Sequence, residues 1–216
     1  MATEEPGTRL DDVENGVRVD DHHEFIEWMA TNPEDAMLSF RAVGAGEGTV
    51  NRTTATIGEW GLGGEERGED REYTLEFGLP AELEESMGYT DPEGRHEATE
   101  VALASLAACI NGTVQYNAIR DGIEVDEVET RVRVPTDLRV LFGIHDSDRA
   151  DEMYGEPEIE VRVEGEDLTE DDAEKLRAYP QRSPVYNLLT LPNPATPHAE
   201  VRGEAPESTT ADSREG

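Results

Sequence analysis

The most apolar stretch of the chain lies near its middle and predicts a long central helix. Residues 101–110 read Val-Ala-Leu-Ala-Ser-Leu-Ala-Ala-Cys-Ile, so almost every position is apolar or small. A helix of this composition has no polar stripe, and we expect it to be buried on all sides. It is predicted to run from about residue 97 to residue 120, with Gly122 as its C-terminal stop.

Alternating hydrophobic and polar positions predict strands on both sides of this helix. The predicted strands cover residues 37–42, 50–57, 73–77, 128–134 and 159–163, with a last edge strand at residues 198–202. Residues 44–48 are rich in glycine and predict the turn between the first two strands. Helices are predicted at three further places: at residues 20–30, after Thr169 as an N-cap, and as a short turn that begins with Ser183 and Pro184.

From the first strand on, this gives the order β-β-β-α-β-β-α-β, which predicts an α+β fold and not a doubly wound parallel sheet. Few strands are available to cover a helix that is apolar all round. A dimer that brings a second sheet over it would supply the cover. We expect one domain over residues 19–202, preceded by a disordered acidic segment at 1–18 and followed by a disordered tail at 203–216.

The charge of the chain is its most unusual compositional property. Acidic residues number 51 and basic residues 18, giving a net charge of -33, and Lys175 is the only lysine. Such a surface looks like that of proteins from a salt-loving archaeon, in which molar salt screens the repulsion. It argues against nucleic acid or an anionic membrane as a partner, because both require clustered Lys and Arg. With no apolar leader after Met1, we expect a cytoplasmic protein.

Cys109, the only cysteine, lies inside the apolar stretch. One cysteine excludes an intrachain disulfide and a cysteine-rich zinc site. The thiol is either an unreactive side chain that packs in the core or a nucleophile that is shielded from solvent. We expect no metal and no cofactor, because adjacent His22 and His23 point to different sides of a helix and the acidic run at 146–151 lacks the glycine and the glutamate of a calcium loop.

A long apolar helix ending Leu-Ala-Ala-Cys, two strands, a second helix and the turn Arg-Ser-Pro-Val-Tyr at residues 182–186 resemble the OsmC/Ohr family. These are osmotically induced and organic-hydroperoxide-resistance proteins. The resemblance covers about residues 36 to 202. It implies an intertwined homodimer in which sheets wrap two central helices, two thiol sites at the subunit interface, and reduction of organic hydroperoxides.

The resemblance also assigns roles to single residues. Cys109 matches the attacking cysteine, whereas the second cysteine of the family falls on Ser183. The family's Asn-Pro-Glu motif falls on residues 97–99, so Glu100 is the nearest substitute for its acid. The activating arginine has no match in the turn at 44–48, and Arg52 or Arg41 would have to reach in. Each of these has an alternative role, as an N-cap for Ser183, a helix-dipole partner for Glu100 and strand-surface charges for the arginines.

The sequence therefore predicts a thiol-dependent hydroperoxide reductase that works with one cysteine. Its partners would be a second copy of the chain, a small organic hydroperoxide and an external thiol that reduces the sulfenic acid. The alternative is a non-catalytic protein of the same fold that binds an apolar small molecule at the dimer interface. The distance from an arginine to Cys109 and the exposure of its sulfur distinguish the two.

Overall fold

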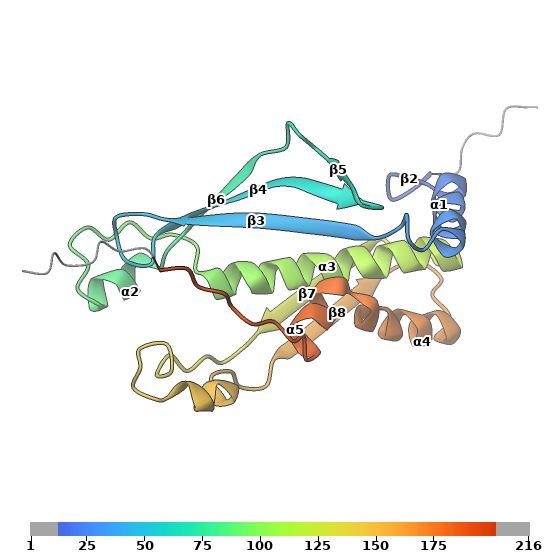
Figure 1. Ribbon diagram of the computed structural model, residues 1–216. Coiled ribbons are helices and arrows are strands. Elements are labelled where there is room, and N and C mark those ends of the chain that lie inside the picture. The colour runs from blue at the N-terminus through green and yellow to red at the C-terminus, as the bar shows by residue number, and fades with distance from the viewer. Residues whose placement is uncertain (1–12, 202–216) are drawn as a thin grey trace, which may run out of the picture.

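The computed structural model describes residues 13–201 and has a mixed α+β fold (Figure 1). A small hairpin and a helix come first, then a four-stranded sheet, the long central helix, and a two-stranded sheet packed with two short helices. The strands are β1 (Val13–Glu14), β2 (Val17–Arg18), β3 (Leu38–Gly46), β4 (Thr53–Leu62), β5 (Glu65–Arg67), β6 (Tyr73–Phe77), β7 (Glu127–Arg133) and β8 (Glu158–Glu164). The α-helices are α1 (Val19–Thr31), α2 (Ala81–Ser86), α3 (Ala98–Asp121), α4 (Glu170–Ala178) and α5 (Pro184–Thr190).

The central helix α3 has well-defined signals at both ends. The Glu97 side chain accepts hydrogen bonds from the backbone N–H groups of Thr99 and Glu100, and Glu100 reaches back to the Glu97 N–H. At the other end Gly122 takes φ 66°, a left-handed conformation that glycine adopts without strain. The predicted extent of this helix is confirmed to within one residue at each end.

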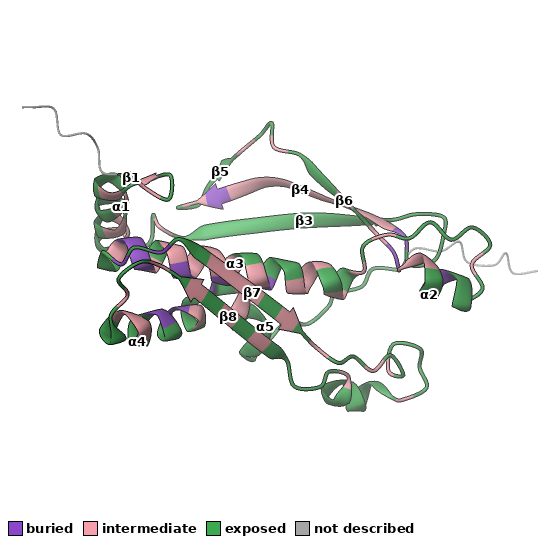
Figure 2. Ribbon diagram, turned by 180° about the vertical axis from the view of Figure 1, so that it is seen from behind, coloured by how far each residue is buried: buried purple, intermediate pink, exposed green. Residues whose placement is uncertain are grey.

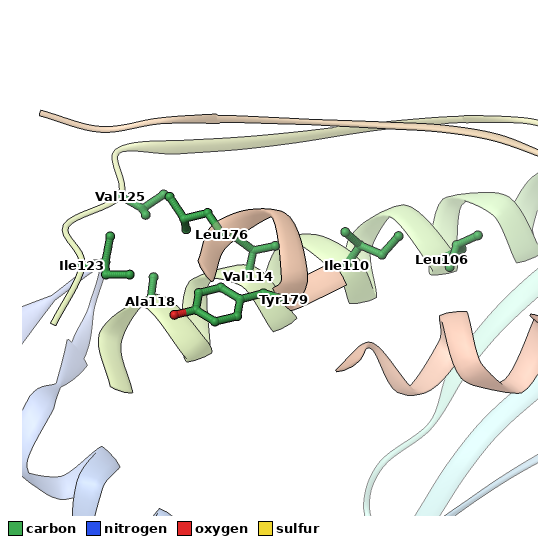
Figure 3. Packing of buried hydrophobic residues seen from close by; sticks show 8 residues of the cluster. All are labelled: Leu106, Ile110, Val114, Ala118, Ile123, Val125, Leu176 and Tyr179. Carbon is green, nitrogen blue, oxygen red and sulfur yellow. The ribbon is translucent and has the colours of Figure 1, made fainter. Parts of the chain in front are cut away.

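The hydrophobic core lies along one face of α3 (Figure 3). Leu106, Ile110 and Val114 recur every four residues on this face and are buried against β7, β8 and α4. The other buried members of the cluster are Ala118, Ile123, Val125, Leu176 and Tyr179. The expectation of a helix buried on all sides is wrong for a single chain, because Ala104, Ser105 and Ala108 are exposed. Figure 2 shows that part of α3 is exposed, since neither sheet of the same chain covers that face.

The four-stranded sheet is antiparallel, with β4 between β3 and the pair β5 and β6. Figure 2 shows β3 exposed along its whole length. The side chains of Phe40 and Val43 on this strand are 72% and 67% exposed. The second predicted strand begins at Thr53 and not at residue 50, because the chain turns there: Asn51 takes φ 60° and the Arg52 N–H bonds the Thr49 carbonyl. The glycine-rich residues 44–46 extend β3 and are not the turn itself.

Residues after the central helix follow the predicted pattern closely. The strands β7 and β8 pair antiparallel, with Val132 opposite Ile159. Thr169 caps α4 in a capping box with Asp172. A 3-10 helix, η2 (Tyr179–Arg182), leads into α5, and Pro184 occupies its first turn. These elements pack against the core face of α3.

Two terminal expectations need correction. Residues 13–18 were expected to be disordered, yet β1 and β2 form a hairpin whose turn is Asn15-Gly16, both with positive φ. The predicted last strand is absent from residues 198–201, where Val201 is 92% exposed and no neighbouring strand offers hydrogen bonds. Residues 1–12 and 202–216, which include the predicted tail, lie outside the described residues. No helix within residues 13–201 has the length and apolarity needed to cross a membrane.

Candidate functional site

Cys109 lies in the middle of α3, on the edge of the core face. At a rotation of about 100° per residue, Cys109 points between buried Leu106 and exposed Ser105, about 60° from the first and about 40° from the second. Its side chain is half-buried. The Thr113 hydroxyl donates to the Cys109 carbonyl at 2.7 Å, but no hydrogen bond or ion pair within residues 13–201 reaches Sγ. The thiol is therefore neither sealed in the core nor held by a cation in the single chain.

Arg52 is inside the protein, at the start of β4. Its Nη2 lies 3.0 Å from Oε2 of Glu84 on α2 and 2.5 Å from the Asp91 carbonyl oxygen, and Nη1 lies 3.1 Å from Oε1 of Glu93. The hydrogen bond from Arg52 holds the pKa of Glu84 below its usual value, and the same bond raises the pKa of Arg52. Arg52 Nε and Glu84 Oε1 are buried with no hydrogen-bond partner among the described residues.

Glu93 connects this ion pair to a second arginine, Arg95. Arg95 bonds Glu47 at 2.7 Å and Glu93 at 3.1 Å, and the hydrogen bond from Arg95 lowers the pKa of Glu47. No sequence signal identifies Glu84 or Glu93 as partners of Arg52, because each lies more than thirty residues from Arg52 and in no recognisable motif. Arg52 is thus neutralised by carboxylates that belong to neither α3 nor the apolar stretch.

The remaining predicted residues occupy structural positions. Arg41 lies on the outer part of β3, where it pairs with Glu59 and with Glu66 at 2.9 Å. Glu100 completes the N-terminal capping box of α3. It precedes Cys109 by nine residues, which is about 13.5 Å along the helix axis. Within one chain, the acid and the thiol are therefore not in contact.

Ser183 is fully buried and caps α5, as its position before Pro184 predicts. Its Oγ accepts a hydrogen bond from the Tyr186 N–H at 3.2 Å. The preceding turn is held to the end of α3 by Tyr179, whose hydroxyl donates to Asp121 at 2.5 Å. Burial is the main cause that raises the pKa of Tyr179 to about 12, while the hydrogen bond from Arg120 is the main cause that lowers the pKa of Asp121 to about 2.

The two histidines considered as metal ligands have other roles. His22 donates from Nε2 to the Tyr116 carbonyl and His23 donates to the Arg120 carbonyl, both at 3.2 Å, so they fasten α1 to the end of α3. Within residues 13–201, no group of three His, Cys, Asp or Glu side chains is arranged to hold a metal ion. The described part of the chain thus offers one distinctive chemical group, the Cys109 thiol.

Comparison with known proteins assigns the C-terminal half to a family. Residues 92–197 match the model of the OsmC-like protein family. A comparison with curated proteins found no match. Among solved structures, the organic hydroperoxide resistance protein OhrB of Bacillus subtilis is 17% identical, with 72% of this chain and 92% of that chain covered and a TM-score of 0.43. An OsmC-like protein from Mycoplasma pneumoniae is 14% identical, with 70% and 86% covered and a TM-score of 0.46.

The matched segment begins just before α3 and ends after α5, so it contains Cys109 and Ser183 but neither Arg41 nor Arg52. It is shorter at its N-terminal side than the resemblance expected from residue 36. The segment carries the central helix, the β7–β8 pair and the capped turn on which that resemblance rested. Residues 92–197 are therefore an OsmC-like domain.

Proposed function

We propose that the protein is a homodimeric, thiol-dependent reductase of organic hydroperoxides and that Cys109 is its nucleophile. The observation that carries the proposal is the position of Cys109: the only thiol of an OsmC-like chain lies half-buried on the central helix, at the edge of a face that its own chain leaves uncovered. A thiol that merely filled the core would be expected among the fully buried residues, as Ile110 is.

The proposed reaction needs no metal and no cofactor. The Cys109 thiolate attacks the terminal oxygen of the hydroperoxide, an S–O bond forms, and the O–O bond breaks. The peroxide gains two electrons and leaves as an alcohol after taking a proton, while the sulfur becomes a sulfenic acid. An external thiol then attacks this sulfur with loss of water, and a second external thiol releases Cys109 and leaves as part of a disulfide.

For the cation that stabilises the thiolate, Arg52 is a better candidate than Arg41. Arg52 is 6% exposed, and its Nε–H has no partner among residues 13–201, whereas Arg41 is 54% exposed and lies between two surface carboxylates. We further propose that Glu84, and not Glu100, has the orienting role, because Glu84 holds Arg52 directly. Since neither arginine bonds Cys109 within residues 13–201, their approach would require the dimer.

The dimer is supported by the apolar surface that one chain leaves exposed. Besides the uncovered face of α3, Leu38, Phe40 and Val43 on β3 are more than half exposed. Burying such surface contributes about 25 cal/mol per Å². Light scattering in molar salt is expected to give twice the chain mass of 23.8 kDa. A well-folded particle of the single mass would remove this part of the proposal.

The chemistry is tested by treating the pure protein with tert-butyl hydroperoxide and measuring Cys109 by mass spectrometry. We expect a gain of one oxygen that Cys109→Ser abolishes and that a small external thiol reverses. Because Ser183 cannot close a disulfide, excess peroxide should also drive Cys109 to the sulfinic and sulfonic acids. The reductase proposal fails if Cys109 reacts no faster than a free cysteine at the same pH.

The alternative function is a binding protein for an apolar small molecule at the dimer interface. One observation favours it: no cation contacts the Cys109 sulfur within residues 13–201. The rate comparison with free cysteine separates the two, since a binding protein has no reason to accelerate the reaction. Binding of an apolar probe without any acceleration would support the alternative.

A further inference from the structure

The chain contains two Asn-Gly pairs, Asn15-Gly16 and Asn111-Gly112. An asparagine before a glycine readily loses its side-chain amide, because glycine has no side chain to hinder the backbone nitrogen that attacks it. The structure places the two pairs in opposite settings: the first is the turn between β1 and β2, and the second lies inside α3. The same chemistry can therefore be compared in a turn and in a helix of one molecule.

The Asn15-Gly16 pair is open to solvent and free to move. The two residues form a two-residue hairpin turn with φ values of 48° and 81°, and both are exposed. A Cβ placed on Gly16 would meet no atom within 4 Å. No hydrogen bond from the Gly16 N–H is found within residues 13–201. The turn can therefore open locally until the Gly16 nitrogen reaches the Asn15 side chain.

The Asn111-Gly112 pair is held on all sides. It lies in the middle of a helix of 24 residues, where backbone hydrogen bonds before and after it fix the peptide group. The Asn111 side chain is held as well, since its Oδ1 accepts a hydrogen bond from the Thr130 hydroxyl on β7 at 2.6 Å. The Gly112 nitrogen can turn toward Asn111 only if the centre of α3 opens, which costs far more than opening an exposed turn.

The Asn15 side chain fastens the N-terminal hairpin to the rest of the molecule. Its Nδ2 donates to the carbonyl oxygen of Val125 at 2.9 Å, in the segment between α3 and β7. The helix α1 follows the hairpin directly, and Figure 1 shows both beside the C-terminal end of α3. His22 and His23 hold α1 there through single hydrogen bonds. A carboxylate at position 15 has no proton to donate, so it would place acceptor oxygens against each other.

We propose that Asn15 is a site of spontaneous deamidation, and that the change loosens the N-terminal hairpin and α1 from the end of α3. The Gly16 backbone nitrogen loses its proton and attacks Cγ of Asn15, so that a cyclic succinimide forms. The bond from Cγ to Nδ2 breaks, and Nδ2 leaves as ammonia after taking up a proton. Water then opens the ring at one of its two carbonyls, and the product is aspartate or isoaspartate.

Both products weaken the anchor. Aspartate adds a negative charge facing the Val125 carbonyl oxygen, which accepts the hydrogen bond from Asn15 before the reaction. Isoaspartate also lengthens the main chain by one carbon in a two-residue turn whose geometry sets the pairing of β1 and β2. The hairpin and α1 precede the segment that matches the family, and the inference does not depend on the proposed reductase function.

The rates at the two Asn-Gly pairs test the modification. Full-length protein is kept in mildly alkaline buffer with molar salt, and mass spectrometry follows the peptides that contain Asn15 and Asn111. We expect Asn15 to deamidate at least about tenfold faster than Asn111 in the folded protein. In urea the two rates should converge, because both are then unfolded Asn-Gly sequences. Equal rates in the folded protein, or no reaction at Asn15, would overturn the assignment.

The effect on α1 is tested with Asn15→Asp, which carries a product side chain from the start. Hydrogen exchange of the α1 amides in molar salt should become about tenfold faster, while exchange in β7 and β8 stays unchanged. The matched control is Asn51→Asp: Asn51 is also exposed, with φ 60°, and no hydrogen bond of its side chain is found in the described part of the chain. It adds the same charge and should leave α1 unchanged. Equal exchange in the two variants would show that Asn15 does not anchor α1.

Discussion

Arg52 and Glu84 form an ion pair from which solvent is almost entirely excluded: Arg52 is 6% and Glu84 0% exposed, and Nη2 lies 3.0 Å from Oε2. The pair joins the start of β4 to α2. Removing one charge from such a pair costs more than the pair itself contributes, because the other charge stays buried without compensation. The second carboxylate on Arg52, Glu93, is 45% exposed and compensates only in part.

Glu84→Gln is therefore expected to be strongly destabilising. The amide keeps the shape of the side chain but leaves Arg52 poorly neutralised, and we expect Tm to fall by roughly 10 °C. The matched control is Glu85→Gln, one residue along the same helix and exposed. Thermal unfolding in molar salt measures the Tm of both variants. Similar Tm values for the two would show that the buried ion pair contributes no more to stability than an exposed glutamate does.

Asp121 and Tyr179 should give stability a dependence on pH at both extremes. Asp121 has its pKa lowered to about 2, so its contribution is present at neutral pH and is lost as pH falls from about 4 toward 2. Tyr179 has its pKa raised to about 12, so its contribution is complete below about pH 10 and is lost as pH rises toward 12. Urea unfolding at several pH values should show that Tyr179→Phe is less stable at pH 7 yet loses less stability between pH 10 and 12. A parallel decline in both proteins would contradict the assignment.

Ser183→Ala should affect the fold and not the thiol chemistry. The change removes the N-cap of α5 and leaves the Tyr186 N–H without its acceptor, at a cost of about 1 kcal/mol. The rate at which tert-butyl hydroperoxide oxidises Cys109 should stay within about twofold of the unsubstituted protein's rate, since Ser183 caps α5 and takes no part in the proposed reaction. A large loss of rate at unchanged stability would instead assign a chemical role to the Ser183 hydroxyl.

Salt should be necessary for the folded state. At 1 M salt the Debye length is about 3 Å, and at 0.01 M it is about 30 Å, so the carboxylates of a chain with net charge -33 repel one another across the molecule at low salt. Circular dichroism is expected to show loss of helix on dialysis from molar to 10 mM salt and recovery on its return. An unchanged spectrum would mean that the acidic surface tolerates low salt.

Local signals account for the parts of the fold that the sequence predicted well. Glu97 begins α3 through hydrogen bonds to the next few residues, and Gly122 ends it through its left-handed backbone conformation. Ser183 and Pro184 begin α5 by similarly local interactions. The alternation in β7 and β8 reflects one face packed on α3. The Asn15-Gly16 turn of the N-terminal hairpin was also readable, but it lies in an acidic stretch that suggested disorder.

The candidate site was predicted less well because its contacts join distant segments. Arg52 and Glu84 are 32 residues apart and lie in elements with no shared periodicity, so only the folded chain brings them together. A family pattern placed the acid near Glu100, but helix geometry separates that residue from Cys109 by about 13.5 Å. Cys109 itself was identifiable because it is the only thiol and lies in the most apolar stretch.

The anchoring of the N-terminal segment affects the order in which the chain is assembled during synthesis. The Asn15 side chain donates to the Val125 carbonyl, 110 residues later, and His22 and His23 bind carbonyls at the end of α3. A ribosome adding about 5–20 residues per second needs about 6–20 s to translate that interval. Residues 13–31 are thus among the first described residues to emerge, yet they can take up their final position only after the whole central helix has been made.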